Sequence, residues 1–331
     1  MEMSPNSGRS LGFCAEAQML LWKGVFFIKS LISTLTFSPI SIDEKPWMDK
    51  LLQSGHRGSL EYSFTSNFIW RKVYQLKAAR FEDRVIVMSN EENPSFIFPS
   101  GQGPVEPVVR AIYDYVSDHG KPMVFNTLLE EDRQKLEAAF PGKFRIEPDR
   151  NDFDYVYETK RLISLSGKKL STKRNHINKF MIQNSDWSYE PITMDNLEDA
   201  RKMSLEWCLA AGCRENESLF DESCAVEQAF KHFFDLQLTG GLLRIGKRTV
   251  AFAIGEELNE TTYIIHIEKA FPEIQGAYQM INQQFTMANC ENYQYVNRED
   301  DAGDEGLRRA KLSYDPALLV EKSSATLISA L

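Results

Sequence analysis

The feature that most constrains the fold is an ordered series of patterns between residues 242 and 312. Three runs rich in β-branched and aromatic residues, separated by the turn signals Gly246-Lys247 and Asn259-Glu260, predict an antiparallel meander. Patterns for a loop, a helix, a short strand and a second helix follow. The predicted elements are strands at 242–245, 248–256, 261–269 and 293–297 and helices at 276–290 and 304–312. This order predicts an α/β domain.

The rest of the chain predicts a second unit of similar kind. A length of 331 residues suggests about two domains, and 43% hydrophobic with 26% charged residues excludes a mainly disordered chain. Further strands are predicted at 84–90, 95–99 and 122–125, and further helices at 105–118, 130–140, 173–183, 194–210 and 225–238. Gly240-Gly241 is expected to end the last of these helices. We predict domains at 35–150 and 151–322, an extension at 1–34 and a tail at 323–331.

The first 34 residues are predicted to lie outside both domains. Their apolar run at 19–32 is interrupted by Lys23 and Lys29, so it falls short of the roughly 20 residues that span a bilayer. No small-residue cleavage site is evident, which argues against a secretory signal. The extension is predicted to be either disordered or an amphipathic helix on a membrane surface. We predict a cytoplasmic protein without a transmembrane segment, with peripheral membrane contact as the alternative.

Charge and cysteine content exclude several classes of protein. The net charge of −9 predicts a surface that repels nucleic acid and anionic lipid, so a polyanion must meet a local basic patch. The five cysteines include no CxxC pair, which indicates neither a disulfide framework nor a zinc module. Reduced thiols are expected. No spacing of carboxylates specifies a metal, and no metal site is predicted.

The loop before the helix 276–290 has the composition of an anion site. Gln275, Gly276 and Ala277 lie at the helix start, and two of them have almost no side chain. Backbone N–H groups at a helix start are unsatisfied and bind anions. We predict that these residues bind donor phosphates. The alternative is a small-residue helix start that packs closely on the sheet.

The strand 261–269 places a histidine and a carboxylate on one face. Because side chains alternate along a strand, His266 and Glu268 share a face with Ile264. A carboxylate beside an imidazole suits a general base acting on an amine or a hydroxyl. The alternative is a hydrogen-bonded pair on a half-buried sheet face.

Residues 159–185 form a basic segment in an acidic chain. The segment has no acid and seven basic residues, namely Lys160, Arg161, Lys168, Lys169, Lys173, Arg174 and Lys179. Such a patch suits the phosphates of a nucleotide, an RNA or a lipid headgroup. The predicted donor-phosphate ligands in it are Lys168, Lys169, Lys173, Arg174 and His176. The alternative is the solvated face of a surface helix.

An acidic cluster follows the strand 293–297. Five acids lie within residues 299–305, and Asp304 and Glu305 stand where they would cap the next helix. The earlier acids could select a cationic group, such as the amino group of an aminoacyl moiety. The predicted substrate-binding residues are Asn297, Arg298, Glu299 and Asp300.

Several stretches together resemble one protein family. They are 60–65, 69–71, 154–157, 167–169, 173–178, 266–270, 296–300 and 306–314. From about residue 35 to 322 the chain is similar to the stand-alone proteins of the DUF2156 family, related to the C-terminal domain of phosphatidylglycerol lysyltransferase. The resemblance implies an α/β (α+β) fold of two GNAT-like acyltransferase domains in tandem, as in the FemABX transferases, with mixed, largely antiparallel sheets.

The resemblance also implies an activity. Characterised membrane relatives of the family move an aminoacyl group from aminoacyl-tRNA to a lipid. The predicted function is therefore acyl transfer, from aminoacyl-tRNA or from acyl-CoA, to an amine or hydroxyl of a small-molecule, peptide or lipid acceptor. No permanently bound cofactor is expected. With aminoacyl-tRNA as donor, the patch from Lys168 to Lys179 would contact the tRNA.

Within this prediction, each catalytic candidate has a role. Glu268, helped by His266, would deprotonate the acceptor. Tyr314 stands near the place where GNAT enzymes often have a tyrosine that protonates the leaving group, and Lys311 could assist the same step. The GNAT pyrophosphate loop is written Q/R-x-x-G-x-G/A, and here Glu273 and Tyr278 depart from it. These departures favour the alternative function, a non-catalytic ligand-binding protein that retains the fold.

Overall fold

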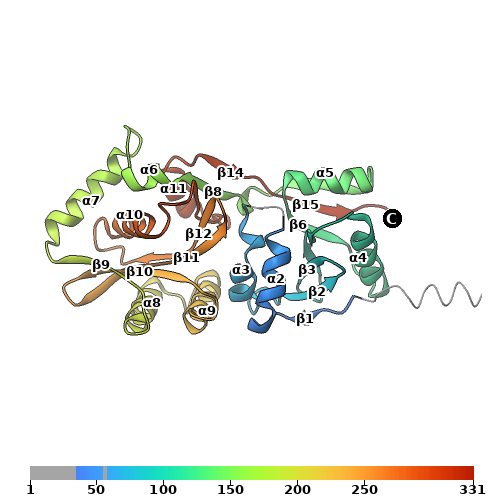
Figure 1. Ribbon diagram of the computed structural model, residues 1–331, viewed down its shortest axis with the longest axis horizontal. Helices are drawn as coiled ribbons and strands as arrows, with labels where there is room; N and C mark the ends of the chain where they lie inside the picture. Colours follow the sequence, from blue (N-terminus) through green and yellow to red (C-terminus); the bar gives the residue numbers. More distant parts are fainter. Residues whose placement is uncertain (1–34, 55–57) are drawn as a thin grey trace, which may run out of the picture.

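The computed structural model describes residues 35–54 and 58–331, so the predicted extension at 1–34 lies outside it. Two sheets follow one another along the long axis of the molecule (Figure 1). The first contains β1 (Ser38–Pro39), β2 (Lys77–Phe81), β3 (Arg84–Ser89), β4 (Ser95–Ile97), β5 (Ser100–Gly101), β6 (Val124–Leu128), β7 (Phe144–Pro148) and β15 (Ser323–Leu327). The second contains β8 (Asp154–Glu158), β9 (Trp187–Pro191), β10 (Thr239–Ile245), β11 (Arg248–Asn259), β12 (Thr262–Ala270), β13 (Tyr295–Asn297) and β14 (Leu318–Val320).

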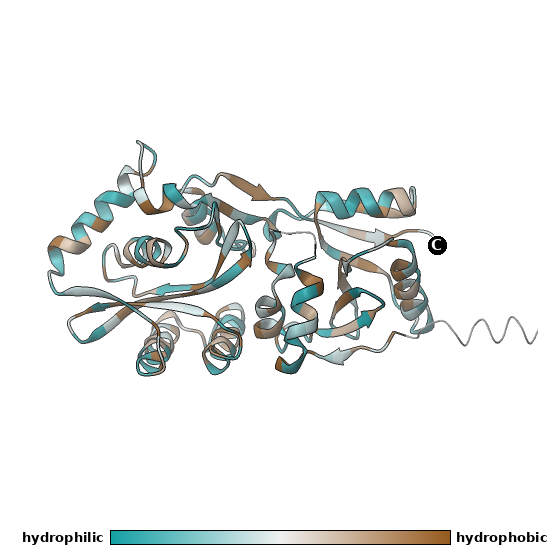
Figure 2. Ribbon diagram, in the orientation of Figure 1, coloured by the Kyte–Doolittle hydropathy of each residue, from teal (hydrophilic) through white to brown (hydrophobic). Residues whose placement is uncertain are grey.

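Helices cover both sheets. Those before β8 are η1 (Ile42–Glu44), α2 (Lys45–Leu52), η2 (Leu60–Tyr62), α3 (Phe64–Trp70), α4 (Glu106–Asp118), α5 (Glu130–Ala139) and η3 (Arg150–Asp152). Those after β8 are α6 (Thr159–Ser164), α7 (Ser171–Gln183), α8 (Leu197–Ala211), α9 (Glu217–Lys231), α10 (Ala277–Asn289) and α11 (Glu305–Leu312). Figure 2 shows α5 as hydrophilic over most of its length, which fits a helix that buries little beyond Leu136. Within the described residues, no helix is both long and apolar enough to cross a bilayer.

The strand order confirms the predicted fold class. The first sheet runs β1-β2-β3-β4-β6-β15-β7, with β5 beside β3, and the second runs β14-β8-β13-β12-β11-β10-β9. Among the described residues, β4 pairs with β6 and β12 with β13 in parallel, and every other pairing is antiparallel. The fold is therefore mixed α/β with two largely antiparallel sheets. The meander and the elements after it all form where the sequence predicts them.

The predicted tail at 323–331 is wrong. Ser323–Leu327 form β15, which inserts between β6 and β7 and pairs antiparallel with both. Ala325 of this strand is fully buried. The chain thus crosses back from the second sheet to the first after β14, because β6 and β7 would otherwise leave their hydrogen-bonding edges unpaired.

Two local predictions before the meander also need correction. The helix predicted at 225–238 is α9, which begins earlier because the side chain of Asn216 caps it by accepting from the Leu219 amide. Gly240-Gly241 does not end this helix but lies within β10, where Ile192 and Tyr189 pack so closely that a Cβ has no room.

The expectation of reduced thiols fails for two of the cysteines. Cys208 and Cys213 form a disulfide with a Cα–Cα distance of 5.3 Å. Gly212 ends α8 in the left-handed conformation (φ 76°), and this turn brings Cys213 back beside the last turn of the helix. Cys224 and Cys290 are free thiols.

One of the two hydrophobic cores spans both halves, and their junction positions the site. A single cluster of buried hydrophobic side chains joins Phe64 and Phe68 of α3 to residues of the second sheet such as Phe252. Arg71, directly after α3, donates to the side chain of Gln228 in α9 at 3.0 Å. The start of α3 therefore lies in a defined place against the second half.

Candidate active site

The candidate site lies where two strands of the second sheet separate. β12 and β13 pair in parallel only between residues 262–264 and 295–297. β12 then continues to Ala270, whereas β13 ends and the chain turns away. The next side chains on this face of β12 are His266 and Glu268, as the alternation predicts, and they face the segment that follows β13.

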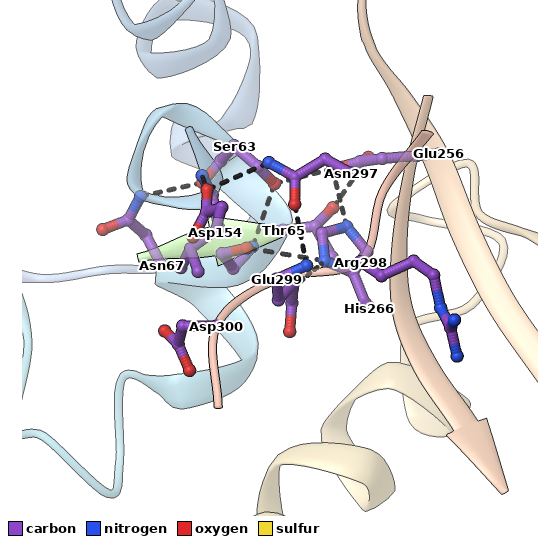
Figure 3. Close-up of polar contacts among 12 residues, drawn as sticks. Ser63, Thr65, Asn67, Asp154, Glu256, His266, Asn297, Arg298, Glu299 and Asp300 are labelled. Carbon is purple, nitrogen blue, oxygen red and sulfur yellow. Dashed lines mark hydrogen bonds and ion pairs between the residues drawn. The ribbon is translucent and has the colours of Figure 1, made fainter. Parts of the chain in front are cut away.

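His266 is buried between a carboxylate from β11 and one from the loop after β13 (Figure 3). Its Nε2 lies 3.2 Å from Oε1 of Glu256, and its Nδ1 lies 2.8 Å from Oε1 of Glu299. Burial alone lowers the pKa of His266, but the two carboxylates outweigh burial and raise it to about 9. The ring is therefore an imidazolium at neutral pH. It has no free lone pair for a proton, so the predicted help to a general base does not fit this geometry.

Glu256 ties this histidine to the first half of the chain. Ser63 donates to its Oε1 at 2.6 Å, and Thr65 donates to its Oε2 at 2.9 Å. Burial raises the pKa of Glu256, but the hydrogen bonds from His266 and the two hydroxyls outweigh it and lower the pKa below its usual range. None of these three residues was predicted from the sequence as a site residue. A carboxylate directly after the apolar run 250–255 was the available signal.

Asn297 holds the loop that contains Glu299. Its Nδ2 donates to Oδ2 of Asp154 at 2.9 Å and to the carbonyl of Gly58 at 2.8 Å, and its Oδ1 accepts from the amide of Glu299 at 2.7 Å. The side chain is fully buried. Since its polar atoms are already paired, the structure assigns Asn297 a positioning role rather than the predicted contact with substrate.

Asp300 lies at the same junction but apart from the hydrogen-bonded cluster of His266 (Figure 3). Among the described residues, its side chain accepts a hydrogen bond only from the amide of Ala302, at 3.0 Å. Burial raises the pKa of Asp300 to about 7. The charges of Lys322 and Lys311 lower it, and those of Asp154 and Glu299 raise it. A carboxyl group with a pKa near neutrality can both accept and release a proton at physiological pH.

Lys311 fixes the backbone of this loop. Its Nζ donates to the carbonyl of Arg298 at 2.6 Å and also to the carbonyl of Asp300. Burial lowers the pKa of Lys311. With its ammonium engaged by two backbone oxygens, Lys311 shapes the loop and is not free to assist a leaving group, contrary to the sequence prediction.

Glu268 belongs to a second polar cluster and not to that of His266. Its Oε1 accepts from Nη2 of Arg298 at 2.9 Å, and its Oε2 accepts from Nδ2 of Asn282 at 2.8 Å. The expected pair of His266 and Glu268 is therefore absent, because each side chain bonds to other partners. Tyr314 lies in this second cluster: its ring is buried, and burial raises the pKa of its hydroxyl group above the usual range.

The helix start at Gly276 is covered by another helix. Gly276 has φ 86°, and a Cβ built there would lie 2.3 Å from the carbonyl oxygen of His176 in α7. Ala277 is fully buried, whereas Gln275 is exposed. The small residues are thus explained by close packing of α10 against α7, which was the alternative interpretation, and not by a phosphate cradle.

Replacing Gly276 with alanine is expected to lower the free energy of unfolding by about 2–5 kcal/mol, since left-handed strain adds to the clash with α7. Urea denaturation followed by circular dichroism measures the change. Gly120→Ala is the matched control, because Gly120 also has positive φ (62°) but no atom within 4 Å of a built Cβ. We expect a loss of about 1 kcal/mol there. Equal losses in the two variants would show that packing against α7 contributes nothing.

The basic segment divides into paired and unpaired side chains. Arg161 and Lys169 both bind Asp315, at 2.6 and 2.8 Å, and Arg174 donates to the carbonyls of Leu165 and Gly167. Lys173 turns inward over the ring of Tyr314. The exposed lysines without an ion pair to any described residue are Lys160, Lys168 and Lys179. The backbone carbonyl of His176, and not its side chain, packs against the start of α10 at Gly276.

Two mixed sheets in tandem, the second of which opens between parallel strands β12 and β13, define a tandem GNAT-like fold. The family described as phosphatidylglycerol lysyltransferase, C-terminal, matches residues 53–326, and the chain belongs to this family. The predicted resemblance is thereby confirmed. At this level the fold and family are those of acyltransferases.

The chain is also similar to solved structures and to a curated relative. A conserved protein of unknown function from Bacteroides thetaiotaomicron is 34% identical, with a TM-score of 0.84 over 89% of this chain and 100% of that one. L-PGS from Bacillus licheniformis is 14% identical, with a TM-score of 0.62 over 88% of this chain and 93% of that one, and shows the shared fold. An uncharacterized protein of Mycoplasmoides gallisepticum is 29% identical over 173 residues. That match covers 51% of this chain and 54% of the relative, about half of each.

Proposed function

We propose that the protein is an aminoacyltransferase, which moves an aminoacyl group from aminoacyl-tRNA to an amine or hydroxyl acceptor. The observation that favours it most is Asp300, a carboxyl group with a pKa of about 7 at the junction of the two halves. Glu268 is bonded to Arg298 and Asn282, and His266 is already protonated. Asp300 is thus the group best suited to accept a proton, and we move the role of general base to it.

The proposed step balances in protons and bonds. As the nitrogen or oxygen of the acceptor bonds to the acyl carbon, its proton passes to Asp300. The ester bond between the acyl carbon and the donor ribose breaks, and Asp300 passes the proton on to the released ribose oxygen, which becomes a hydroxyl group. No permanently bound cofactor is needed for this reaction.

The surroundings of Tyr74 support an aminoacyl group as the transferred group. Burial raises the pKa of the Tyr74 hydroxyl, and the negative charges of Asp300, Asp221, Asp152 and Glu299 raise it further. A region of such negative potential favours a cationic amino group. This agrees with the predicted role of Glu299 and Asp300 in selecting the amino group of the substrate.

The choice between the two donors rests on α10 and α7. Coenzyme A would place its pyrophosphate at the start of α10, where Gly276 packs against the carbonyl of His176. The exposed lysines 160, 168 and 179 offer phosphate contacts to tRNA instead. The description of the family, phosphatidylglycerol lysyltransferase, supports aminoacyl transfer but does not identify the acceptor for this chain.

Transfer assays with labelled aminoacyl-tRNA and labelled acetyl-CoA test the proposal directly. We expect label to pass from aminoacyl-tRNA to an added amine or hydroxyl acceptor, and not from acetyl-CoA. Transfer from acetyl-CoA alone would show that the donor is acyl-CoA and not aminoacyl-tRNA. Binding of aminoacyl-tRNA without transfer to any acceptor in a broad panel would favour the non-catalytic alternative.

The tRNA contact makes a separate prediction. Lys160→Ala/Lys168→Ala/Lys179→Ala is expected to weaken tRNA binding about tenfold or more and to flatten its dependence on salt concentration. The matched control is Lys50→Ala/Lys202→Ala/Lys231→Ala, which removes three exposed lysines elsewhere and changes the net charge equally. Filter binding over a series of salt concentrations measures both. The same loss in the two variants would mean that net charge matters and the patch does not.

A further inference from the structure

Arg298 is incompletely paired in the interior of the second half. Its side chain is 13% exposed and points away from the His266 cluster (Figure 3). Nη2 donates to Glu268, whereas Nη1 is buried without a hydrogen-bond partner among the described residues. Leaving a buried donor of a charged group unsatisfied is costly, so such an atom indicates a missing acceptor.

Arg298 and a second cation, Lys173, both lie against the ring of Tyr314. Nζ of Lys173 lies 4.4 Å from the centre of the Tyr314 ring, and the guanidinium carbon of Arg298 lies 4.8 Å from it. Lys173 forms no ion pair with any described residue. Glu268 balances only one of the two positive charges, so the cluster retains an excess positive charge next to a buried, unpaired N–H group.

Asn282 adds a hydrogen-bond acceptor at the same place. Its side chain is fully buried, and Nδ2 donates to Glu268. Its Oδ1 has no hydrogen-bond partner among the described residues. The cluster therefore offers a charged N–H group, an ammonium group and one amide oxygen. A group that has negatively charged oxygens and one O–H matches this set.

We propose that Arg298 and Lys173, packed against Tyr314, form an internal binding site for a phosphate group, with Asn282 accepting from its protonated oxygen. Lys173 is half-buried, so the site is reached from the α7 side. The sequence predicts donor-phosphate binding for Lys173 and substrate binding for Arg298, on separate grounds. In the structure both side chains contact the ring of Tyr314. Because a phosphodiester, such as that of the terminal nucleotide in tRNA, has no O–H, the phosphate is a monoester, either of a free nucleotide or of a phosphorylated acceptor. Only this choice rests on the proposed function; the site itself does not.

Isothermal titration of the protein with inorganic phosphate at constant ionic strength tests the site without any transfer reaction. We expect saturable binding at millimolar concentrations to the unaltered chain. Lys173→Met should weaken it about tenfold to a hundredfold, the range for a lost charge-assisted hydrogen bond. Lys202→Met is the matched control, because Lys202 lies on α8 outside the basic segment, is exposed and has no ion pair to a described residue. It should bind as the unaltered chain does.

Arg298→Lys is the second variant, since lysine keeps a positive charge beside Glu268 but removes the unpaired Nη1. We expect it to fold, as judged by circular dichroism, and to lose phosphate binding. Absence of saturable binding to the unaltered chain, or equal binding by Lys173→Met and Lys202→Met, would overturn the proposal. Competition by adenosine monophosphate but not by glycerol 3-phosphate would assign the phosphate to a nucleotide, and the reverse would assign it to a phosphorylated acceptor. If the unaltered chain binds phosphate but transfers no aminoacyl group, only the proposed function is contradicted.

Discussion

Replacing Lys322 with methionine is expected to lower the free energy of unfolding by about 3–5 kcal/mol, the usual cost of breaking a buried ion pair by removing one partner. Lys322 lies between β14 and β15, where the chain crosses from the second sheet back to the first. Its buried Nζ donates to Oδ1 of Asp154 at 2.6 Å and to Oε1 of Glu61 at 2.7 Å. Methionine would leave two buried carboxylates without a counter-charge. Urea denaturation at pH 7, followed by circular dichroism, measures the loss.

The pH dependence of this loss separates charge from packing. Burial disfavours the charged form of Lys322, yet Asp154 and Glu61 hold its pKa above the usual range, so its contribution is fully present at neutral pH. Burial already raises the pKa of Glu61, and without the charge of Lys322 its folded-state pKa rises further above its unfolded value. The folded variant then binds more protons than the unfolded chain, and its deficit should shrink as the pH falls from 7 toward 4. Lys50→Met, an exposed change on α2, should cost under about 0.5 kcal/mol. A deficit that does not change with pH would contradict the role of the ion triad.

The order of elements in the second half could be predicted because it depends on local patterns. The meander, α10, β13 and α11 each follow from residue types and turn signals within about a dozen residues. β15 could not be predicted, because its five residues carry no strong alternation and their partners, β6 and β7, lie far earlier in the chain. The disulfide escaped for a similar reason. A spacing of five residues forms one only because Gly212 turns the chain back.

The site could be predicted in its parts but not in its pairings. Strand alternation correctly places His266 and Glu268 on one face. Which carboxylate each side chain meets depends on the register of β11, on the loop after β13 and on how α3 packs across the junction. Glu256 and Asp154 therefore could not be predicted as site residues from the sequence. The sequence predicts Asp300 as a substrate-binding acid. Its raised pKa is a consequence of burial, which the sequence alone does not show.

Replacing Asp300 with asparagine is expected to lower kcat/KM for aminoacyl transfer by a factor of about 10²–10⁴, the usual contribution of a general base. The carboxyl group must be ionised to accept a proton, and burial raises its pKa to about 7. Activity of the unaltered chain should therefore rise with pH up to about 7 and then level off. The residual activity of Asp300→Asn should lack this step. Initial rates with labelled aminoacyl-tRNA between pH 5 and 9 measure both effects.

Measuring the stability of the same variant makes the test more exact, because its stability is expected to rise while its activity falls. The folded-state pKa of Asp300 lies above its unfolded value, so the folded state binds more protons and the native fold loses stability as the pH rises from about 4 to 7. Asparagine removes this cost, and Asp300→Asn should melt at a higher temperature than the unaltered chain at pH 8. Loss of activity with a gain in stability cannot be attributed to unfolding. Asp195→Asn, an exposed change before α8, should alter neither property. Activity retained in Asp300→Asn but lost in Glu268→Gln would return the role of base to Glu268.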